Sequence, residues 1–235
     1  MAAGARPWGS SASLRDDLIL LAPVAVVLTF VSSQTGINHH LRYSFPILPF
    51  LFVWTSKVAR TAALARPALA RVVFATLTWA VGSSLWTYPH SLTYFNELVG
   101  GPTQGHYHLD NSNVDWGQDL LYLREWCHKH PEAHPLGVAH YVSLVSPRIF
   151  GIDAVPIPQG RVPEGVGSPI PPHEAGPLPG WYAISLNHVH RRTRDYEYFL
   201  DFRPVATAGY SMFIYHITLA EANAVRPRLG LPELP

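Results

Sequence analysis

The sequence predicts a helical membrane region of about three transmembrane helices followed by a small α/β domain. No acidic residue occurs between Leu18 and Trp86, where long apolar runs alternate with short polar stretches. Charged residues make up only 14% of the 235 residues, against roughly 25% in ordinary soluble proteins. Beyond Tyr88, acids, prolines and histidines accumulate. We therefore expect a transmembrane region in residues 1–87 and an α/β domain in residues 88–235.

Three apolar runs are the candidate transmembrane helices: Leu18–Val31, Tyr43–Trp54 and Val72–Trp86. Each is shorter than the roughly 20 residues that cross a bilayer comfortably. The first run could instead be a signal peptide, and all three could be core helices of a soluble protein. Three runs in succession with almost no charge favour transmembrane helices.

Basic residues between the second and third runs predict the orientation. Lys57, Arg60, Arg66 and Arg71 occur there without an acid. The positive-inside rule places this connecting loop in the cytoplasm. The N-terminus is then cytoplasmic, and everything after Tyr88 is extracytoplasmic. We expect an integral protein of the inner or plasma membrane.

The second half of the chain has the alternating helix and strand signals of an α/β domain. Helical spacing of apolar residues runs from Asp119 to His130 and ends at Pro131. The remaining predicted elements are strands at Leu136–Tyr141, Ala154–Ile157 and Trp181–Leu186, short helices at Ser146–Phe150 and Asp195–Phe202, a strand or hairpin at Val205–Ile217, and a short helix after Ala220.

One loop before the predicted helix is unusually rich in oxygen atoms. The candidate ligands for an acceptor or a sugar are Asp110, Asn113, Asp115, Trp116, Gln118 and Asp119. Such oxygens suit a sugar or a divalent cation, and an indole can stack on the apolar face of a sugar. A structural interpretation is equally open, in which these acids cap and start the helix.

Other features exclude several classes of function. The net charge of +1 does not predict nucleic-acid binding, and the single Cys127 excludes an internal disulfide and a multi-cysteine metal site. His106, His108 and Asp110 alternate as metal ligands could, but no HExxH spacing occurs. We therefore assign no metal site, no certain cofactor and no catalytic residue.

A third polar group precedes the second apolar run. His40, Arg42 and Tyr43 lie where the predicted helix meets the outer surface of the membrane. An arginine at this level can anchor the helix by reaching to the interface. Its guanidinium also matches the geometry of a phosphate. We consider these three residues candidates for binding a lipid-linked phosphate.

Two stretches resemble a known enzyme group. Ile37–Phe50, INHHLRYSFPILPF, resembles the RY-x-x-P-x-x-PF segment of sugar transferases with the GT-C fold. Tyr94–Leu123, with DNSNVDWGQDL in its second half, resembles a segment of a bacterial branch similar to the dolichyl-phosphate-mannose protein mannosyltransferases, glycosyltransferase family 39. Trp181–Leu186 and Gly209–Tyr215 resemble late strands of the same branch.

The resemblance implies an enzyme that takes a sugar from a polyprenyl-phosphate donor at the outer face of the membrane. In that group an acidic residue in the first external loop acts as base or metal ligand. No such loop precedes the RY-x-x-P segment here, and Asp16 and Asp17 are predicted to be cytoplasmic. We therefore expect the C-terminal portion of a transferase, which needs the missing N-terminal half for catalysis. The alternative is a non-enzymatic, membrane-anchored module that binds sugar or metal.

Overall fold

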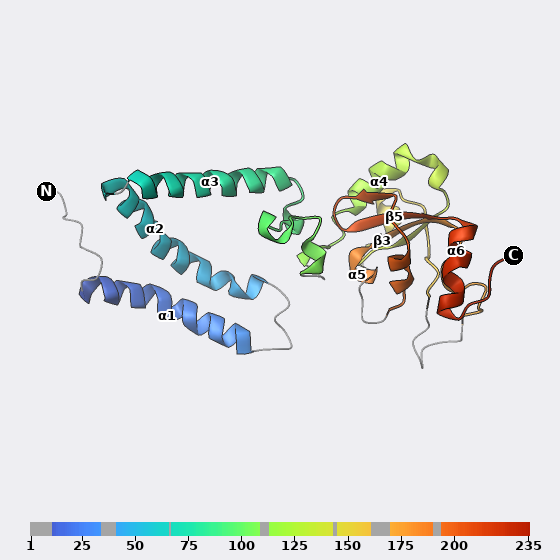
Figure 1. The fold of residues 1–235 in the computed structure, drawn as a ribbon, viewed down its shortest axis with the longest axis horizontal. Helices are drawn as coiled ribbons and strands as arrows, with labels where there is room; N and C mark the ends of the chain where they lie inside the picture. The colour runs from blue at the N-terminus through green and yellow to red at the C-terminus, as the bar shows by residue number, and fades with distance from the viewer. Residues whose placement is uncertain are drawn as a thin grey trace. The chain divides into compact units, whose positions relative to one another are not determined.

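A computed structural model describes residues 11–33, 41–65, 67–108, 113–142, 145–160, 170–189 and 194–235. The chain divides into two compact units, Met1–Gly82 and Ser83–Pro235 (Figure 1). The first unit is helical, and the second contains the sheet. We describe each unit by itself.

The helices of the first unit extend well beyond the apolar runs. They are α1 (Ser11–Ser33), the 3₁₀ helix η1 (Leu41–Ile47), α2 (Leu48–Ala65) and α3 (Pro67–Thr87), whose last turn belongs to the second unit. The expectation of a basic loop from Lys57 to Arg71 is wrong, because α2 continues to Ala65 and α3 begins at Pro67. Pro49 lies in the first turn of α2, where a missing N–H costs no helical hydrogen bond.

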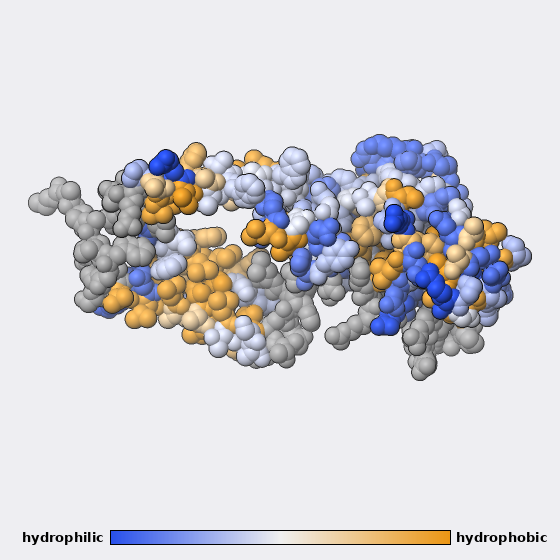
Figure 2. All heavy atoms as spheres, in the orientation of Figure 1, coloured by the Kyte–Doolittle hydropathy of each residue, from blue (hydrophilic) through white to orange (hydrophobic). Residues whose placement is uncertain are grey.

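Helix α1 packs against α2 and η1. Asp17 of α1 forms an ion pair with Lys57 of α2, and the Trp54 indole N–H donates to the same carboxylate at 3.1 Å. The large apolar side chains of these helices are mostly exposed, among them Leu18, Val26, Phe30 and Phe52. Figure 2 shows hydrophobic residues gathered over this unit.

Within the described residues, one helix, Pro67–Thr87, is long and apolar enough to cross a membrane. Its 21 residues span about 31 Å, close to the hydrocarbon thickness of a bilayer. A membrane association is thus indicated by α3 alone, and three spans stay a prediction.

A five-stranded mixed sheet forms the centre of the second unit, in the strand order β2-β1-β3-β5-β4. Figure 1 labels its strands β3 and β5. Its strands are β1 (Leu136–Ala139), β2 (Ala154–Val155), β3 (Gly180–Ser185), β4 (Ala206–Ala208) and β5 (Met212–Ile217). β2, β1 and β3 are parallel, whereas β3, β5 and β4 pair antiparallel. The predicted α/β class is confirmed, and the predicted strand or hairpin at Val205–Ile217 is the hairpin β4–β5.

Side chains alternate between two cores on opposite faces of the sheet. One core packs Ala183 and Ile214 against Leu120, Leu123 and Cys127 of helix α4 (Leu120–Lys129). The other core packs Tyr182 and Tyr215 of the same strands against Phe199. Phe199 belongs to the 3₁₀ helix η8 (Glu197–Asp201).

Short helices complete the second unit. These are α5 (Leu186–Val189), α6 (Leu219–Val225) and the 3₁₀ helices η2 (Ser91–Thr93), η3 (Glu97–Val99), η4 (Gly105–Tyr107), η6 (Pro131–Ala133), η7 (Pro147–Phe150) and η9 (Arg226–Leu229). The predicted helices at 119–130, 146–150 and 195–202 therefore correspond to α4, η7 and η8. A capping box of Thr218 and Glu221 starts α6.

Arg226 connects the C-terminal tail to the loop before β3 through hydrogen bonds. Its guanidinium is fully buried and donates to the carbonyl oxygens of Pro172, Ala175, Pro177 and Pro232 at 2.6–3.2 Å. Four carbonyl acceptors replace the water that this cation loses on burial.

We expect Arg226→Met to destabilise the second unit by about 3 kcal/mol, because four carbonyls, two of them in buried hydrogen bonds, lose their donor. The measurement is thermal unfolding of the full chain in detergent, followed by a thiol-reactive dye that reaches the buried Cys127 only after unfolding. Arg228→Met is the matched control, since Arg228 is largely exposed and pairs with Asp201 at the surface. Equal midpoints for the two variants would contradict the anchoring role.

Candidate functional site

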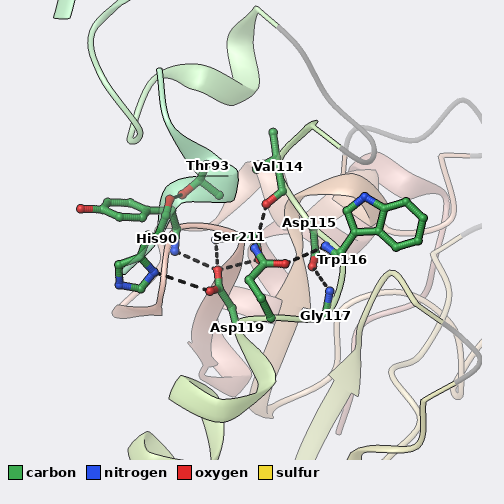
Figure 3. Close-up of polar contacts among 10 residues, drawn as sticks. His90, Thr93, Val114, Asp115, Trp116, Gly117, Asp119 and Ser211 are labelled. Atoms are coloured by element: carbon green, nitrogen blue, oxygen red, sulfur yellow. Dashed lines mark hydrogen bonds and ion pairs between the residues drawn. The ribbon is translucent and has the colours of Figure 1, made fainter. Parts of the chain in front are cut away.

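Asp119 joins the start of α4 to the turn between β4 and β5 (Figure 3). Its carboxylate is fully buried. Oδ2 accepts hydrogen bonds from the Tyr210 N–H at 3.0 Å, the Ser211 N–H at 2.8 Å and the Ser211 hydroxyl at 2.8 Å. Three donors on one oxygen fix the position of the hairpin relative to α4.

The other oxygen of Asp119 faces a histidine. Oδ1 is buried without a hydrogen-bond partner, and Nδ1 of His90 lies 3.8 Å away. The His90 ring is flanked by Tyr122 at 4.5 Å and Tyr210 at 4.9 Å between ring centroids. Burial raises the pKa of Asp119, and the nearby Asp115 charge adds to this, although the Ser211 and Tyr210 hydrogen bonds act in the opposite direction.

Asp115 makes a second internal connection. Its Oδ1 accepts from the Gly117 N–H at 2.7 Å, and its Oδ2 accepts from the hydroxyl of Ser185 at the end of β3. The Gln118 side chain stabilises the same loop, because it accepts a hydrogen bond from the Trp116 N–H at 2.7 Å and donates one to the Val114 carbonyl at 2.9 Å. The loop 113–119 is therefore held by its own polar side chains.

Trp116 is the exception in this loop. Its side chain is 54% exposed, and Figure 3 shows the indole pointing away from the Asp119 carboxylate. Two buried carboxylates thus hold a loop that presents a large aromatic ring to solvent. This arrangement suits stacking on an apolar face of a ligand.

Trp116 belongs to a loop that contacts the carboxyl end of strand β3, where Asp115 binds Ser185. The neighbouring parallel strand β1 ends beside α5, since the imidazole Nε2 of His188 contacts the carbonyl oxygen of His140, just after β1, at 2.9 Å. The Tyr141 and His188 rings are 6.4 Å apart. We call Trp116, His140, Tyr141, Asn187 and His188 the carboxyl-end cluster.

The topology gives this cluster a functional meaning. The chain leaves β1 toward β2 on one side, whereas β3 lies on the other side of β1. In open α/β sheets, ligands bind outside the carboxyl ends of strands at such a switch in strand order. The carboxyl-end cluster is therefore the best candidate for a binding site in the second unit.

The predicted site residues separate into different environments. Asn113, Asp115, Trp116, Gln118 and Asp119 lie in one loop, but both of its described carboxylates bind the protein itself. Asp119 is the N-cap residue of α4 without capping it through its side chain. Asp110 and His40 lie outside the described residues.

The predicted phosphate-binding residues belong to the first unit. Arg42 and Tyr43 are the second and third residues of η1, and the Tyr43 side chain is exposed. Among the residues that the structure describes, no three His, Cys, Asp or Glu side chains are grouped as they would be around a metal ion. A divalent cation stays an untested possibility for the loop that begins at Asp110.

Sequence reasoning did not identify His90, Ser185, Ser211, Tyr141 and His188. The partners of Asp119 are 91 and 92 residues away in sequence, so no local spacing reveals them. A signal did exist for Tyr141 and His188, since Tyr141 is the last residue of one predicted strand and His188 follows another. The rule on carboxyl ends of parallel strands would have selected them once the strand order was known.

We expect Gly209→Ala to unfold the hairpin around Asp119. Gly209 has φ +62°, and a Cβ there would lie 2.2 Å from the Asp119 carboxylate. Gly151→Ala is the matched control, because Gly151 has φ +74° but open space around it, so that variant loses only the roughly 1–2 kcal/mol of left-handed backbone strain. The measurement is the Cys127 thermal assay, and similar midpoints for both variants would contradict the predicted clash.

Asp119 also predicts a pH dependence of stability. The pKa of Asp119 is raised in the folded state above its ordinary value of 3.8. Between pH 3.8 and the raised pKa, the folded state therefore binds more protons than the unfolded state. Its contribution to the free energy of unfolding is then full at low pH and declines as pH rises through the raised pKa. Asp119→Asn, a neutral variant, should lose less stability relative to the native chain at pH 7 than at pH 4. Denaturant unfolding followed by near-ultraviolet circular dichroism measures this difference; a loss that grows with pH would refute it.

Searches for relatives gave no match among protein-family models, curated proteins or solved structures. A function is therefore inferred from two features of the chain. One is the geometry of the carboxyl-end cluster, and the other is the sequence resemblance of the segments around Arg42 and Trp116.

Proposed function

We propose that this chain is the C-terminal portion of a membrane glycosyltransferase that uses a polyprenyl-phosphate-linked sugar. In the reaction, a hydroxyl oxygen of the acceptor forms a bond to the anomeric carbon of the sugar. The bond from that carbon to the phosphate oxygen breaks, and polyprenyl phosphate leaves with the bonding electron pair. The acceptor proton passes to a base.

One observation carries the assignment of a sugar to the second unit. The exposed Trp116 indole belongs to a loop that two buried carboxylates hold in place. A preorganised aromatic ring loses little conformational entropy when a sugar stacks on it. In this proposal Trp116 and the neighbouring strand ends bind the acceptor or the transferred sugar, whereas Gln118 holds the loop through its hydrogen bonds to Trp116 and Val114.

The buried acids limit what this loop does in the reaction. Asp115 and Asp119 already accept hydrogen bonds from Gly117, Ser185, Tyr210 and Ser211. Neither carboxylate is placed to take a proton from an acceptor in bulk solution. The base therefore comes from elsewhere, in this proposal from an N-terminal half of the transferase with an acidic external loop.

Three spans are supported by the exposure of apolar side chains along α1, α2 and α3. In water such extended apolar surfaces are unfavourable, whereas lipid chains cover them. The Asp17–Lys57 ion pair agrees with the assignment of both residues to one side of the membrane, which the basic residues between the second and third runs make the cytoplasmic side in this proposal. The second unit is then extracytoplasmic, at an inner or plasma membrane.

The donor phosphate is assigned to η1. Arg42 and Tyr43 follow one another at the start of this helix, and His40 directly precedes Leu41 in sequence. In the proposed topology they lie at the outer surface, where the phosphate of a lipid-linked donor lies. Arginine suits this role because its planar guanidinium can bind two phosphate oxygens at once.

A second candidate function is a non-enzymatic, membrane-anchored module that binds sugar. The internal use of Asp115 and Asp119 favours it, because the loop then provides a binding surface without an acid or base. This candidate predicts that the full chain alone binds oligosaccharides through Trp116. The transferase proposal instead requires affinity for a polyprenyl phosphate.

We expect Arg42→Ala to lower the photolabelling of the full chain by a benzophenone-tagged polyprenyl phosphate at least fivefold. The measurement uses membranes that contain equal amounts of each variant, with unlabelled polyprenyl phosphate or polyprenol as competitor. Arg71→Ala is the control, since Arg71 is an exposed residue near the opposite end of the proposed topology. Labelling that survives Arg42→Ala, or that polyprenol blocks as well as the phosphate does, would refute phosphate binding at Arg42.

A further inference from the structure

The end of α3 and the segment that follows it expose an unusual number of large apolar and aromatic side chains. Trp86 is 86% exposed, Tyr88 74%, Leu98 96% and Tyr107 69%. We call residues 86–107 the exit segment. We propose that the exit segment lies in the headgroup layer of the membrane that α3 crosses, and that lipid covers these side chains. This inference rests on the membrane span of the proposed function and adds a second, peripheral contact.

Hydrogen bonds hold the start of the exit segment beside the end of α3. The Tyr94 hydroxyl lies 2.9 Å from the hydroxyl of Ser83, which is one turn before the helix ends. The His90 N–H donates to the Thr87 carbonyl at 2.8 Å. Tyr94 therefore lies at the level of the last turn of α3. When α3 crosses the hydrocarbon layer, this level is the membrane–water interface.

The rest of the exit segment is kept close to this level. Leu98 is four residues from Tyr94, so it lies within about 14 Å of it. The Asn96 side chain accepts from the Leu98 N–H at 3.1 Å, so the exposed leucine is on an ordered turn. A Cβ on Gly105 would lie 2.1 Å from the Phe95 ring, which shows that η4, with Tyr107, packs directly on Phe95.

The chemistry of these side chains identifies the occupant. Tryptophan and tyrosine favour the headgroup layer because each has an apolar ring and a polar group. No Lys or Arg occurs between Val72 and Leu123, so attraction to anionic lipid does not contribute. The proposed contact is with the neutral headgroup layer, and it should not depend on salt or on anionic lipid.

The test places one fluorescent label at a time on the full chain in phosphatidylcholine vesicles. NBD is attached to Leu98→Cys, or to Leu77→Cys near the middle of α3, in a Cys127→Ala background. Ile149→Cys and Leu200→Cys are controls, because both side chains are exposed and they lie on η7 and η8, which pack on opposite faces of the sheet. Quenching is measured with spin labels at carbon 5 or carbon 16 of the lipid chain.

We expect the shallow spin label to quench the Leu98→Cys site at least threefold more strongly than it quenches either control. The deep spin label should quench the Leu77→Cys site best. If position 98 behaves like both controls while position 77 is quenched, the headgroup contact is refuted and the span stands. If position 77 is not quenched, the span itself is refuted, and the inference fails with it. Loss of quenching at position 98 in 1 M salt, or quenching that requires anionic lipid, would also overturn it.

Discussion

The buried Asp119 carboxylate is the interaction on which the second unit depends. It accepts hydrogen bonds from two backbone N–H groups and one hydroxyl in the β4–β5 turn, and Ser211, which supplies two of these three donors, is fully buried. Removing the carboxylate leaves these donors unpaired, which is costly in a low-dielectric interior. Gly209 follows from the same constraint, since no larger residue leaves room for the carboxylate. The start of α4 and the position of the antiparallel hairpin are thus determined together.

This constraint explains why the polar side chains of the loop 113–119 serve folding. Asp115 and Asp119 point inward to Ser185 and Ser211, and Gln118 closes the loop on itself. What remains for a ligand is the outward Trp116 ring and the strand ends beside it. The sequence alone does not decide whether the loop is structural or functional, because it does not show which carboxylates are buried and which are exposed. The structure assigns both acids to folding and leaves the Trp116 indole exposed, which is the ring that the proposed function uses.

Local patterns predicted most elements of the second unit, because the spacing of apolar residues and the identity of turn residues are both local signals. The hairpin at 205–217 and the helix at 119–130 are examples. The helix ends around Lys57–Arg71 were missed, because positive charge indicates the side of a membrane but does not interrupt a helix. The burial of Arg226 was missed for another reason. Its four acceptors are backbone carbonyls, which carry no side-chain signature, and three of them are about 50 residues away in sequence.

His90 connects the Asp119 network to the end of α3. Its N–H donates to the Thr87 carbonyl at the end of α3, and its ring packs between Tyr122 of α4 and Tyr210 of the hairpin turn. The last turn of α3 and the core of the α/β domain therefore share one set of contacts. A domain attached in this way does not move freely relative to residues 83–94. If these residues lie at the membrane surface, the depth of Tyr94 also fixes the height of Asp119 and its loop, and therefore the distance of Trp116 from the headgroups. A lipid-linked sugar could then meet the indole at a fixed height above the bilayer, which a flexible tether would not provide.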